Sequence, residues 1–429
     1  MNLLTKSAAE PRRASFALMA GLALAGAIGC SKNDTGGTGD QTSSVPASEV
    51  PGGGGGVDIL FMIDNSSSMT SMQQKLVAQI PMFLTTLQSA ARPLSDFHIA
   101  VISSDLGAPG DSTSSIGCTV DGDQGIFQSQ PRGDCQAGTL APGATYISNV
   151  GGVANYTGQL TDVLACITPL GANGCGFEHQ LASVARALGA DGQPAPAANA
   201  GFLRRDAELA IFLLTNEDDC SAPADTTLYS LNGHPQNLSN PLGPIANYRC
   251  NEFGHLCRDP AGANPGALIM PPLNPPADAQ GSGTPTLGLV DCESNDTSSG
   301  MLTPISKFVA EIKALKADPS RITVGALVAP ATPYTVEWTP AAGGNDDAGE
   351  LWPQIEHSCG AQGDVAPLAA DVTTDGSFGD PAVRITQWVQ AFGDNGVLGS
   401  ICDDYGLTMG SMAGKVLANR GAAPDAGTD

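Results

Sequence analysis

Asp64, Ser66 and Ser68 place one carboxylate and two hydroxyl groups at alternating positions of a short polar stretch. Hard cations such as Mg²⁺, Mn²⁺ and Ca²⁺ prefer ligand sets made only of oxygen atoms. The stretch ends a predicted strand, Val57–Asp64, and precedes a predicted helix from about Ser71 to Gln88. We therefore predict a cation site on a strand-to-helix turn. The alternative is a serine-rich turn that only caps the helix.

Three more apolar runs predict buried strands that alternate with helical patterns, at Phe97–Ile102, Leu209–Thr215 and Ile322–Val328. The predicted helices cover residues 160–167, 177–188, 301–315, 383–392 and 407–417. This alternation predicts an α/β fold with a doubly wound, mostly parallel sheet. Ligands of such sheets bind beyond the carboxyl ends of the strands, where Asp64 lies.

The D-x-S-x-S motif between a buried strand and a helix resembles the metal-ion-dependent adhesion site of von Willebrand factor type A domains. The resemblance covers about 57–420 and implies a Rossmann-like type A fold. In that family the two serines coordinate the metal directly, and the aspartate acts largely through water. A threonine and an aspartate from two other loops complete the site. An acidic residue of the protein ligand then completes the coordination of the metal.

The two other loops depart from the family pattern. Asn216 stands where the family has its aspartate, and the acidic residues Glu217, Asp218 and Asp219 follow it. We expect these residues to contribute to the metal site, with a solvated acidic turn as the alternative. The loop at 171–176 contains no threonine, and Glu178 lies just after it, at the expected start of a helix.

Other candidate motifs are weaker. The sequence Thr374-Asp375-Gly376 follows no apolar strand, so we interpret it as a turn. The acidic stretches 121–123 and 345–347 lack the spacing of a known Ca²⁺ loop. The sequence contains no G-x-S-x-G, H-E-x-x-H or phosphate-binding loop in a suitable context, so we do not expect an enzyme.

Two long insertions, 106–155 and 216–300, follow the carboxyl ends of predicted strands. We expect both insertions to lie at the sheet edge that carries Asp64 and to line the metal site. Both are rich in loop-forming residues, and disulfides offer a way to order them.

Eleven cysteines are present, and ten remain when Cys30 is set aside. Ten is an even number, as five disulfides require in a secreted protein. Short spacing predicts Cys118–Cys135 and Cys166–Cys175, and we also expect Cys359–Cys402. The remaining four are expected to pair among themselves: Cys220, Cys250, Cys257 and Cys292.

Residues 1–29 have a basic start and an apolar run that ends directly before Cys30, which resembles a bacterial lipoprotein signal. This predicts lipidation of Cys30 and an outer-membrane location in the cell envelope, with an ordinary secretory signal as the alternative. Residues 30–56 are then a flexible Gly/Ser-rich linker, and residues 421–429 a disordered tail. The formal net charge of −24 disfavours nucleic acid as a partner.

These features predict a lipid-anchored protein whose type A domain binds a protein ligand through Mg²⁺, or through Mn²⁺ or Ca²⁺. Membrane contact is expected only through the anchor. The alternative is a structural surface module with a vestigial metal site, which binds through its disulfide-rich insertions.

Overall fold

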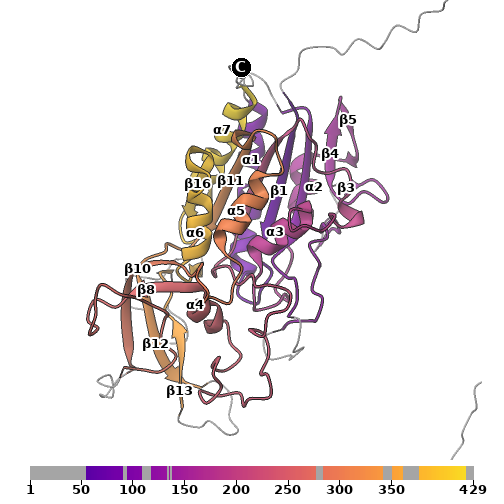
Figure 1. Ribbon diagram of the computed structural model, residues 1–429. Helices are drawn as coiled ribbons and strands as arrows, with labels where there is room; N and C mark the ends of the chain where they lie inside the picture. The colour runs from indigo at the N-terminus through magenta and orange to yellow at the C-terminus, as the bar shows by residue number, and fades with distance from the viewer. Residues whose placement is uncertain are drawn as a thin grey trace, which may run out of the picture. The chain divides into compact units, whose positions relative to one another are not determined.

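The predicted apolar runs form the parallel centre of a seven-stranded sheet in the computed structural model (Figure 1). The structure describes residues 55–89, 94–108, 117–132, 135, 138–276, 284–341, 350–360 and 376–421. Four strands are buried along their whole length: β1 (Val57–Ile63), β2 (Phe97–Ser103), β7 (Glu208–Leu214) and β11 (Ile322–Val328). The near-continuous apolar runs therefore predicted these strands correctly, as expected for strands covered on both faces.

Within the described residues the strand order is β16-β11-β7-β1-β2-β4-β5. The parallel strand β16 (Gly396–Ser400) was not predicted, because it is short, glycine-rich and half-exposed at the sheet edge. At the opposite edge, β4 (Ile147–Val150) and β5 (Val153–Ala154) run antiparallel to their neighbours. The sheet is therefore mostly parallel, as predicted, with antiparallel strands at one edge.

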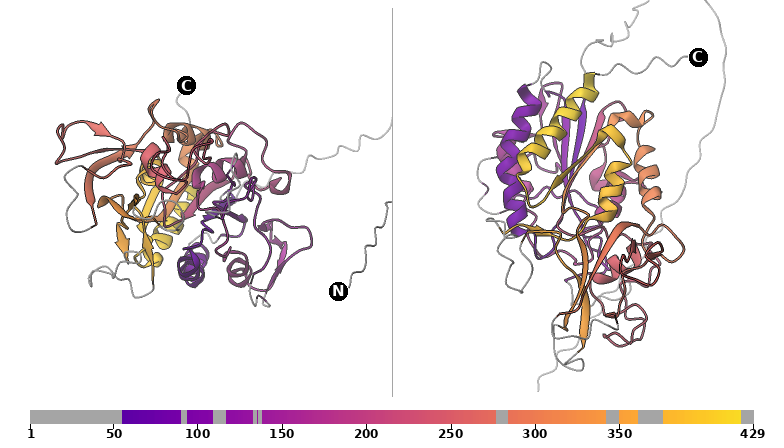
Figure 2. Two further views of the ribbon diagram at one scale, coloured as in Figure 1. Left: turned by 90° about the horizontal axis from the view of Figure 1, so that it is seen from below. Right: turned by 90° about the vertical axis from the view of Figure 1, so that its left-hand side faces the viewer.

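Helices cover both faces of this sheet (Figure 2). One face packs against α1 (Thr70–Ser89), α2 (Leu160–Ile167) and α7 (Tyr405–Gly421). The other packs against α3 (Gln180–Leu188), α5 (Ile305–Lys313) and α6 (Val383–Gln390). The two separate apolar clusters on the two faces correspond to the doubly wound arrangement that the sequence predicted.

Some predicted helix ends were wrong. Helix α3 begins at Gln180 rather than residue 177, because the His179 amide donates to Ser104 O outside the helix. Helix α5 is shorter than 301–315, and α7 continues to Gly421, a residue that we had assigned to the tail.

The short elements of the described chain lie mostly in the connections. They are β3 (Thr139–Leu140), β6 (Tyr156–Thr157), β14 (Cys359–Gly360), β15 (Phe378–Gly379), η2 (Ala197–Asn199), η3 (Pro319–Arg321) and η4 (Gly393–Asn395). Strand β3 pairs with β6, and β14 pairs with β15.

A second, five-stranded sheet has the order β13-β12-β10-β8-β9. The predicted insertion supplies α4 (Tyr248–Gly254), β8 (His255–Arg258), β9 (Leu268–Ile269) and β10 (Thr286–Ser294). The chain after β11 supplies β12 (Tyr334–Pro340) and β13 (Leu351–Ile355). We call this sheet with α4 the insertion lobe. None of these elements was predicted, because the sheet joins two segments that are distant in sequence.

In the part of the chain that the structure describes, five disulfides join the ten expected cysteines. Cys359–Cys402 is confirmed, and the remaining four cysteines pair as Cys220–Cys250 and Cys257–Cys292. The predictions Cys118–Cys135 and Cys166–Cys175 were wrong, because the bonds are Cys118–Cys175 and Cys135–Cys166. Cys166 lies in α2 and the other three lie outside helices and strands, and each bond joins residues that are further apart in sequence than the predicted pairs, so short spacing did not predict the partners.

The described residues from Gly55 onward belong to one compact unit. Among them, no helix is long and apolar enough to cross a membrane. Several predicted segments lie outside the described residues. They are the signal segment, Cys30, most of the linker, residues 345–347, Thr374, Asp375 and residues 422–429.

Candidate functional site

Asp64 is fully buried just beyond the end of β1 and accepts three hydrogen bonds. The Ser66 amide and the Ser104 hydroxyl donate to its Oδ1 over 2.8 and 3.1 Å, and the Thr215 hydroxyl donates to its Oδ2 over 2.7 Å. Burial raises the pKa of Asp64, while these hydrogen bonds act to lower it. Donors from the ends of three adjacent strands, β1, β2 and β7, therefore fix this carboxyl group in place.

Three side-chain oxygens gather beside Asp64. The hydroxyl oxygens of Ser66 and Ser68 are 3.5 Å apart, and the Ser68 hydroxyl donates to Asn216 Oδ1 over 3.1 Å. Ser66 is buried and Ser68 is half-buried. The structure thus brings together four of the predicted site residues: Asp64, Ser66, Ser68 and Asn216.

The loop at 171–176 packs against the same turn. The Gln73 side chain from α1 donates to Asp64 O over 2.7 Å and to Gly171 O over 2.9 Å. The Gly174 amide donates to Asn65 O, and a Cβ at Gly174 would come within 2.2 Å of Asn65 Oδ1. A larger residue at 174 would therefore displace the Asn65 side chain, and the 171–176 loop packs directly on the turn that carries the two serines.

Glu178 and Glu217 lie on the inner side of the same site. Glu178 is buried, and its Oε1 has no hydrogen-bond partner. Glu217 Oε2 accepts a 2.9 Å hydrogen bond from the Asn247 amide group. Burial, followed by the charges of Glu217 and Asp64, raises the pKa of Glu178 well above its ordinary value. Burial, followed by the charge of Asp380, raises the pKa of Glu217 to about 8.

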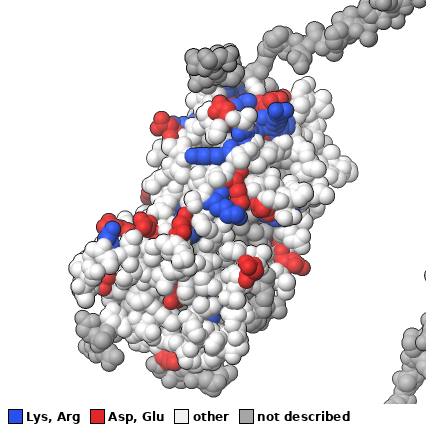
Figure 3. All heavy atoms as spheres, viewed as in Figure 1, with Lys and Arg blue, Asp and Glu red and all other residues white. Residues whose placement is uncertain are grey.

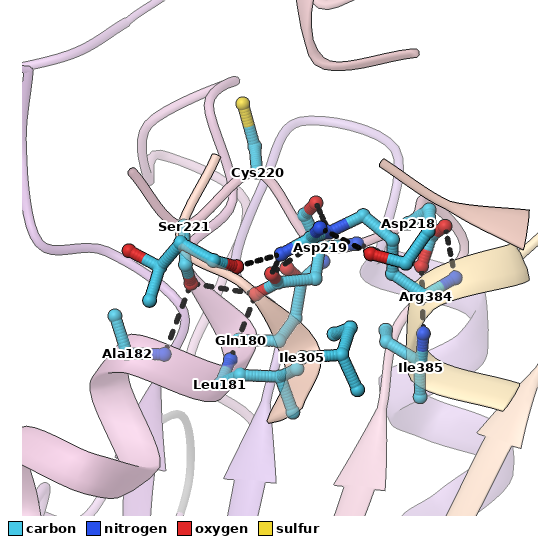
Figure 4. Close-up of polar contacts among 12 residues, drawn as sticks. Gln180, Leu181, Ala182, Asp218, Asp219, Cys220, Ser221, Ile305, Arg384 and Ile385 are labelled. Carbon is cyan, nitrogen blue, oxygen red and sulfur yellow. Dashed lines mark hydrogen bonds and ion pairs between the residues drawn. The ribbon is translucent and has the colours of Figure 1, made fainter. Parts of the chain in front are cut away.

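Asp218 does not join this cluster and instead connects the insertion lobe to α6. Its Oδ2 lies 2.8 Å from His255 Nε2 and accepts from the Arg384 amide over 2.7 Å, and its Oδ1 accepts from the Ile385 amide (Figure 4). Burial acts to raise the pKa of Asp218, but the hydrogen bonds and charges of His255 and Arg384 together lower it. All of these contacts lie within the protein.

Asp219 is also committed to partners within the protein. It forms a fully buried ion pair of 3.0 Å with Arg384 and accepts from the Leu181 amide and the Ser221 hydroxyl (Figure 4). Asp218 and Asp219 thus bind backbone groups at the starts of α6 and α3. The structure does not bring these two carboxylates to Asp64, although the sequence suggested them as substitute ligands.

An open cleft of about 550 Å³ adjoins the site. Its described lining includes Ser66, Glu178, Glu217 and Asn247, with glycine and alanine from the loop at 171–176 and from Gly117 and Ala246. No Lys or Arg is among these lining residues. A partner side chain that enters the cleft therefore meets hydroxyl, amide and carboxyl oxygens.

The chemistry of these oxygens fits a hard cation. Among the described residues, no group of three or more His, Cys, Asp or Glu side chains is arranged to hold a metal. The unpartnered Oε1 of Glu178 is a buried acceptor that such an ion can satisfy.

Sequence reasoning did not assign Ser104, Thr215 or Glu178 to the site. Ser104 and Thr215 could have been assigned to the site from the sequence, since each is a hydroxyl residue directly after a buried strand. The acidic stretch 121–123 does not form a site, because Asp123 accepts from the Ser103 hydroxyl over 2.5 Å while Asp121 is exposed.

Comparison with known proteins assigns no family to this chain. No protein-family model matches it, and no curated protein sequence matches it. Among solved structures, it is similar to the pilus adhesin RrgA from Streptococcus pneumoniae, with 12% sequence identity and a TM-score of 0.20. The match covers 80% of this chain and 38% of that one. A likeness at this TM-score carries no argument about fold or function.

Proposed function

We propose that this chain is a type A domain protein of the cell envelope that binds a partner protein through a divalent cation. Asp64, Ser66, Ser68 and Asn216 are the proposed core of the cation site. One observation carries the proposal: oxygens from two strand ends gather beside a buried, hydrogen-bonded carboxyl group, next to a cleft of about 550 Å³.

Each residue has a distinct role in this proposal. Ser66 and Ser68 present their hydroxyl oxygens, and Asn216 presents an uncharged amide oxygen beside them. Asp64 is fixed by its donors and orients the turn that carries both serines. A bound divalent cation supplies a positive charge that an acidic side chain of the partner can coordinate.

The proposed location is the outer membrane of the bacterial cell envelope, at its periplasmic face or at the cell surface, with the chain anchored through a lipid on Cys30. The five disulfides support an oxidising compartment, because such bonds persist outside the cytoplasm. Mass spectrometry of the mature N-terminus tests the anchor. An acylated Cys30 supports it, and an unmodified start at another residue contradicts it.

Protein partners fit this surface better than nucleic acid. The net charge is −24, and Figure 3 shows a face formed mostly by uncharged residues, with basic side chains in small groups. An extended basic surface is what phosphate backbones require. Capture of partners from an envelope extract, with and without a chelator, therefore tests whether binding depends on the cation.

The cation site itself is tested by thermal unfolding with Mg²⁺, Mn²⁺ or Ca²⁺. Binding to the folded state alone stabilises it by about 2.7 kcal/mol at a concentration of about 100 times the dissociation constant. We expect the metals to raise the melting temperature, and Asp64→Ala and Ser68→Ala to abolish the increase.

Ser71→Ala is the matched control, because it removes a nearby serine hydroxyl that does not belong to the site. It is expected to retain the full metal response. If the melting temperature of the wild-type protein is unchanged at millimolar metal, the site is vestigial. Binding by the insertion lobe is then the better hypothesis.

A further inference from the structure

Glu178 and Glu217 form an acidic pair that no basic side chain compensates. Glu178 lies two residues before Gln180, the first residue of α3, and Glu217 lies in the loop after β7. The structure gives neither residue an ion pair, whereas the neighbouring acids Asp218, Asp219 and Asp380 have His255, Arg384 and His357. In this part of the described chain, negative charge therefore exceeds positive charge at the two glutamates.

Glu178 and Glu217 lie between an open cleft and a small inner cavity. Both glutamates line the open cleft beside Ser66, and both also line a small inner cavity of about 10 Å³. A volume of this order holds about one water-sized atom. The other acids of the inner cavity have basic partners, whereas the two glutamates meet only each other and the Asn247 amide group among the described side chains.

Unsatisfied acceptors lie at the same place. Glu178 is only 2% exposed, and its Oε1 has no partner. Gln180 is fully buried and donates to Thr215 Oγ1 and Glu217 O, but its own Oε1 has no partner. A buried acceptor without a donor costs about 1–3 kcal/mol, and like charges in proximity add to this cost. One cation relieves both penalties.

We propose that Glu178 and Glu217 are ligands of the divalent cation held by the Ser66, Ser68 and Asn216 oxygens. This inference rests on the proposed function and deepens it. Glu178 would supply, from the end of the 171–176 loop, the oxygen that the missing threonine does not. The two carboxylates would supply the charge that Asn216 lacks.

This ligand set also indicates the class of cation. Two serine hydroxyls, one amide and two carboxylates, spread over three loops, offer more protein oxygens than Mg²⁺ ordinarily takes. Ca²⁺ accepts six to eight oxygens in irregular geometry. We therefore expect Ca²⁺ to bind at least as tightly as Mg²⁺, and the partner to fill a smaller share of the coordination sphere.

The test compares Glu178→Gln with Glu252→Gln by titrating the full chain with Ca²⁺ and Mn²⁺ in a calorimeter. Glu252 in α4 is the matched control. It is also a buried glutamate, 7% exposed with no partner for Oε2, but it lines neither the open cleft nor the inner cavity. Loss of residues that only support metal ligands costs about 10–100-fold in affinity, so we expect at least about a tenfold loss for Glu178→Gln. Glu252→Gln is expected to leave the affinity unchanged.

Thermal unfolding provides a second readout that does not require binding to be measured directly. Removing a buried acid should raise the metal-free melting temperature in both glutamine variants, so failure to fold is not the expected result. Only Glu178→Gln should then lose the further increase with metal. Glu217→Gln should behave like Glu178→Gln.

The outcomes separate this inference from the proposed function. If Ser68→Ala weakens metal binding and Glu178→Gln does not, the glutamates are not ligands, while the proposed function stands. If Glu178→Gln weakens binding and Ser68→Ala does not, the glutamates bind a cation outside the proposed adhesion site. If the wild-type protein binds no metal, both proposals are wrong.

Discussion

Acidic residues beside the cleft occupy two different environments. Asp218 and Asp219 are compensated by His255, Arg384 and helix-terminal amides. Glu178 and Glu217 have no such compensation, and burial raises the pKa of both. The consecutive acids Glu217, Asp218 and Asp219 thus differ in environment, because only the two aspartates meet a basic partner in the fold.

Arg384 is expected to be essential for stability. It is fully buried and binds Asp219, Ser294 and Thr303 through its guanidinium group. Arg384→Met should lower the free energy of unfolding by about 3–5 kcal/mol, because it leaves the Asp219 charge buried and unpaired. Denaturant unfolding measures this loss.

The control for that prediction is Arg258→Met. Arg258 pairs with Asp291 at 3.7 Å, and both side chains are exposed. Exposed pairs contribute about 0–1 kcal/mol, so this variant should stay close to the wild type. Equal losses in both variants would contradict the importance we assign to the buried pair.

Glu252 makes stability depend on pH. Burial raises its pKa from 4.5 to about 7, against the opposing charge of Arg249. The folded state therefore holds this proton more tightly than the unfolded state. Its contribution to the free energy of unfolding is complete below pH 4.5 and is lost as pH rises through about 7.

Glu252→Gln should remove this pH dependence, which is on the order of 2 kcal/mol, because glutamine cannot ionise. Unfolding in urea at pH 5 and pH 8, with a chelator present, measures the change. The variant should lose less stability between the two pH values than the wild type. Parallel curves would show that Glu252 is not the titrating group.

At the scale of elements, loop connections determine the shape of the site. The Cys118–Cys175 bond joins the first insertion to the 171–176 loop, whose Gly174 contacts Asn65. The Cys257–Cys292 bond instead joins β8 and β10 within the insertion lobe. The two bonds therefore constrain different parts of the molecule.

Replacing Cys118 and Cys175 by serine should lower stability by about 2–5 kcal/mol and weaken the metal-induced rise in melting temperature. Loss of the bond frees the loop that precedes Glu178. Replacing Cys257 and Cys292 by serine is expected to cost stability while preserving the metal-induced rise. A loss of the rise in both variants would contradict the local role of Cys118–Cys175.

The four central strands were predictable because burial on both faces leaves a continuous apolar run in the sequence. Strand β16 lacks that signal, and the insertion lobe depends on pairing between β10 and β12 across a long stretch of chain. In the site, the D-x-S-x-S motif was visible because its residues are adjacent. Glu178 was not assigned, because its role depends on the packing of the 171–176 loop against Asn65.

At the scale of the whole molecule, both halves of the insertion lobe leave the central sheet at neighbouring strands. The first follows β7 and returns to α5, and the second follows β11 and returns to α6. The Asp218–His255 contact, the Asp219–Arg384 ion pair and packing between α6 and β10 join the lobe to the core. The lobe and the proposed cation site thus share the loop that carries Asn216 and Glu217.

The divided origin of the insertion lobe has a consequence for synthesis and for engineering. Strand β10 has its β12 partner only after more than forty further residues have left the ribosome or the translocation channel. Until then, one edge of a nascent hairpin is open to pairing with other chains. For the same reason the lobe cannot be transferred to another protein as one continuous segment, since either half alone would have an unpaired strand there.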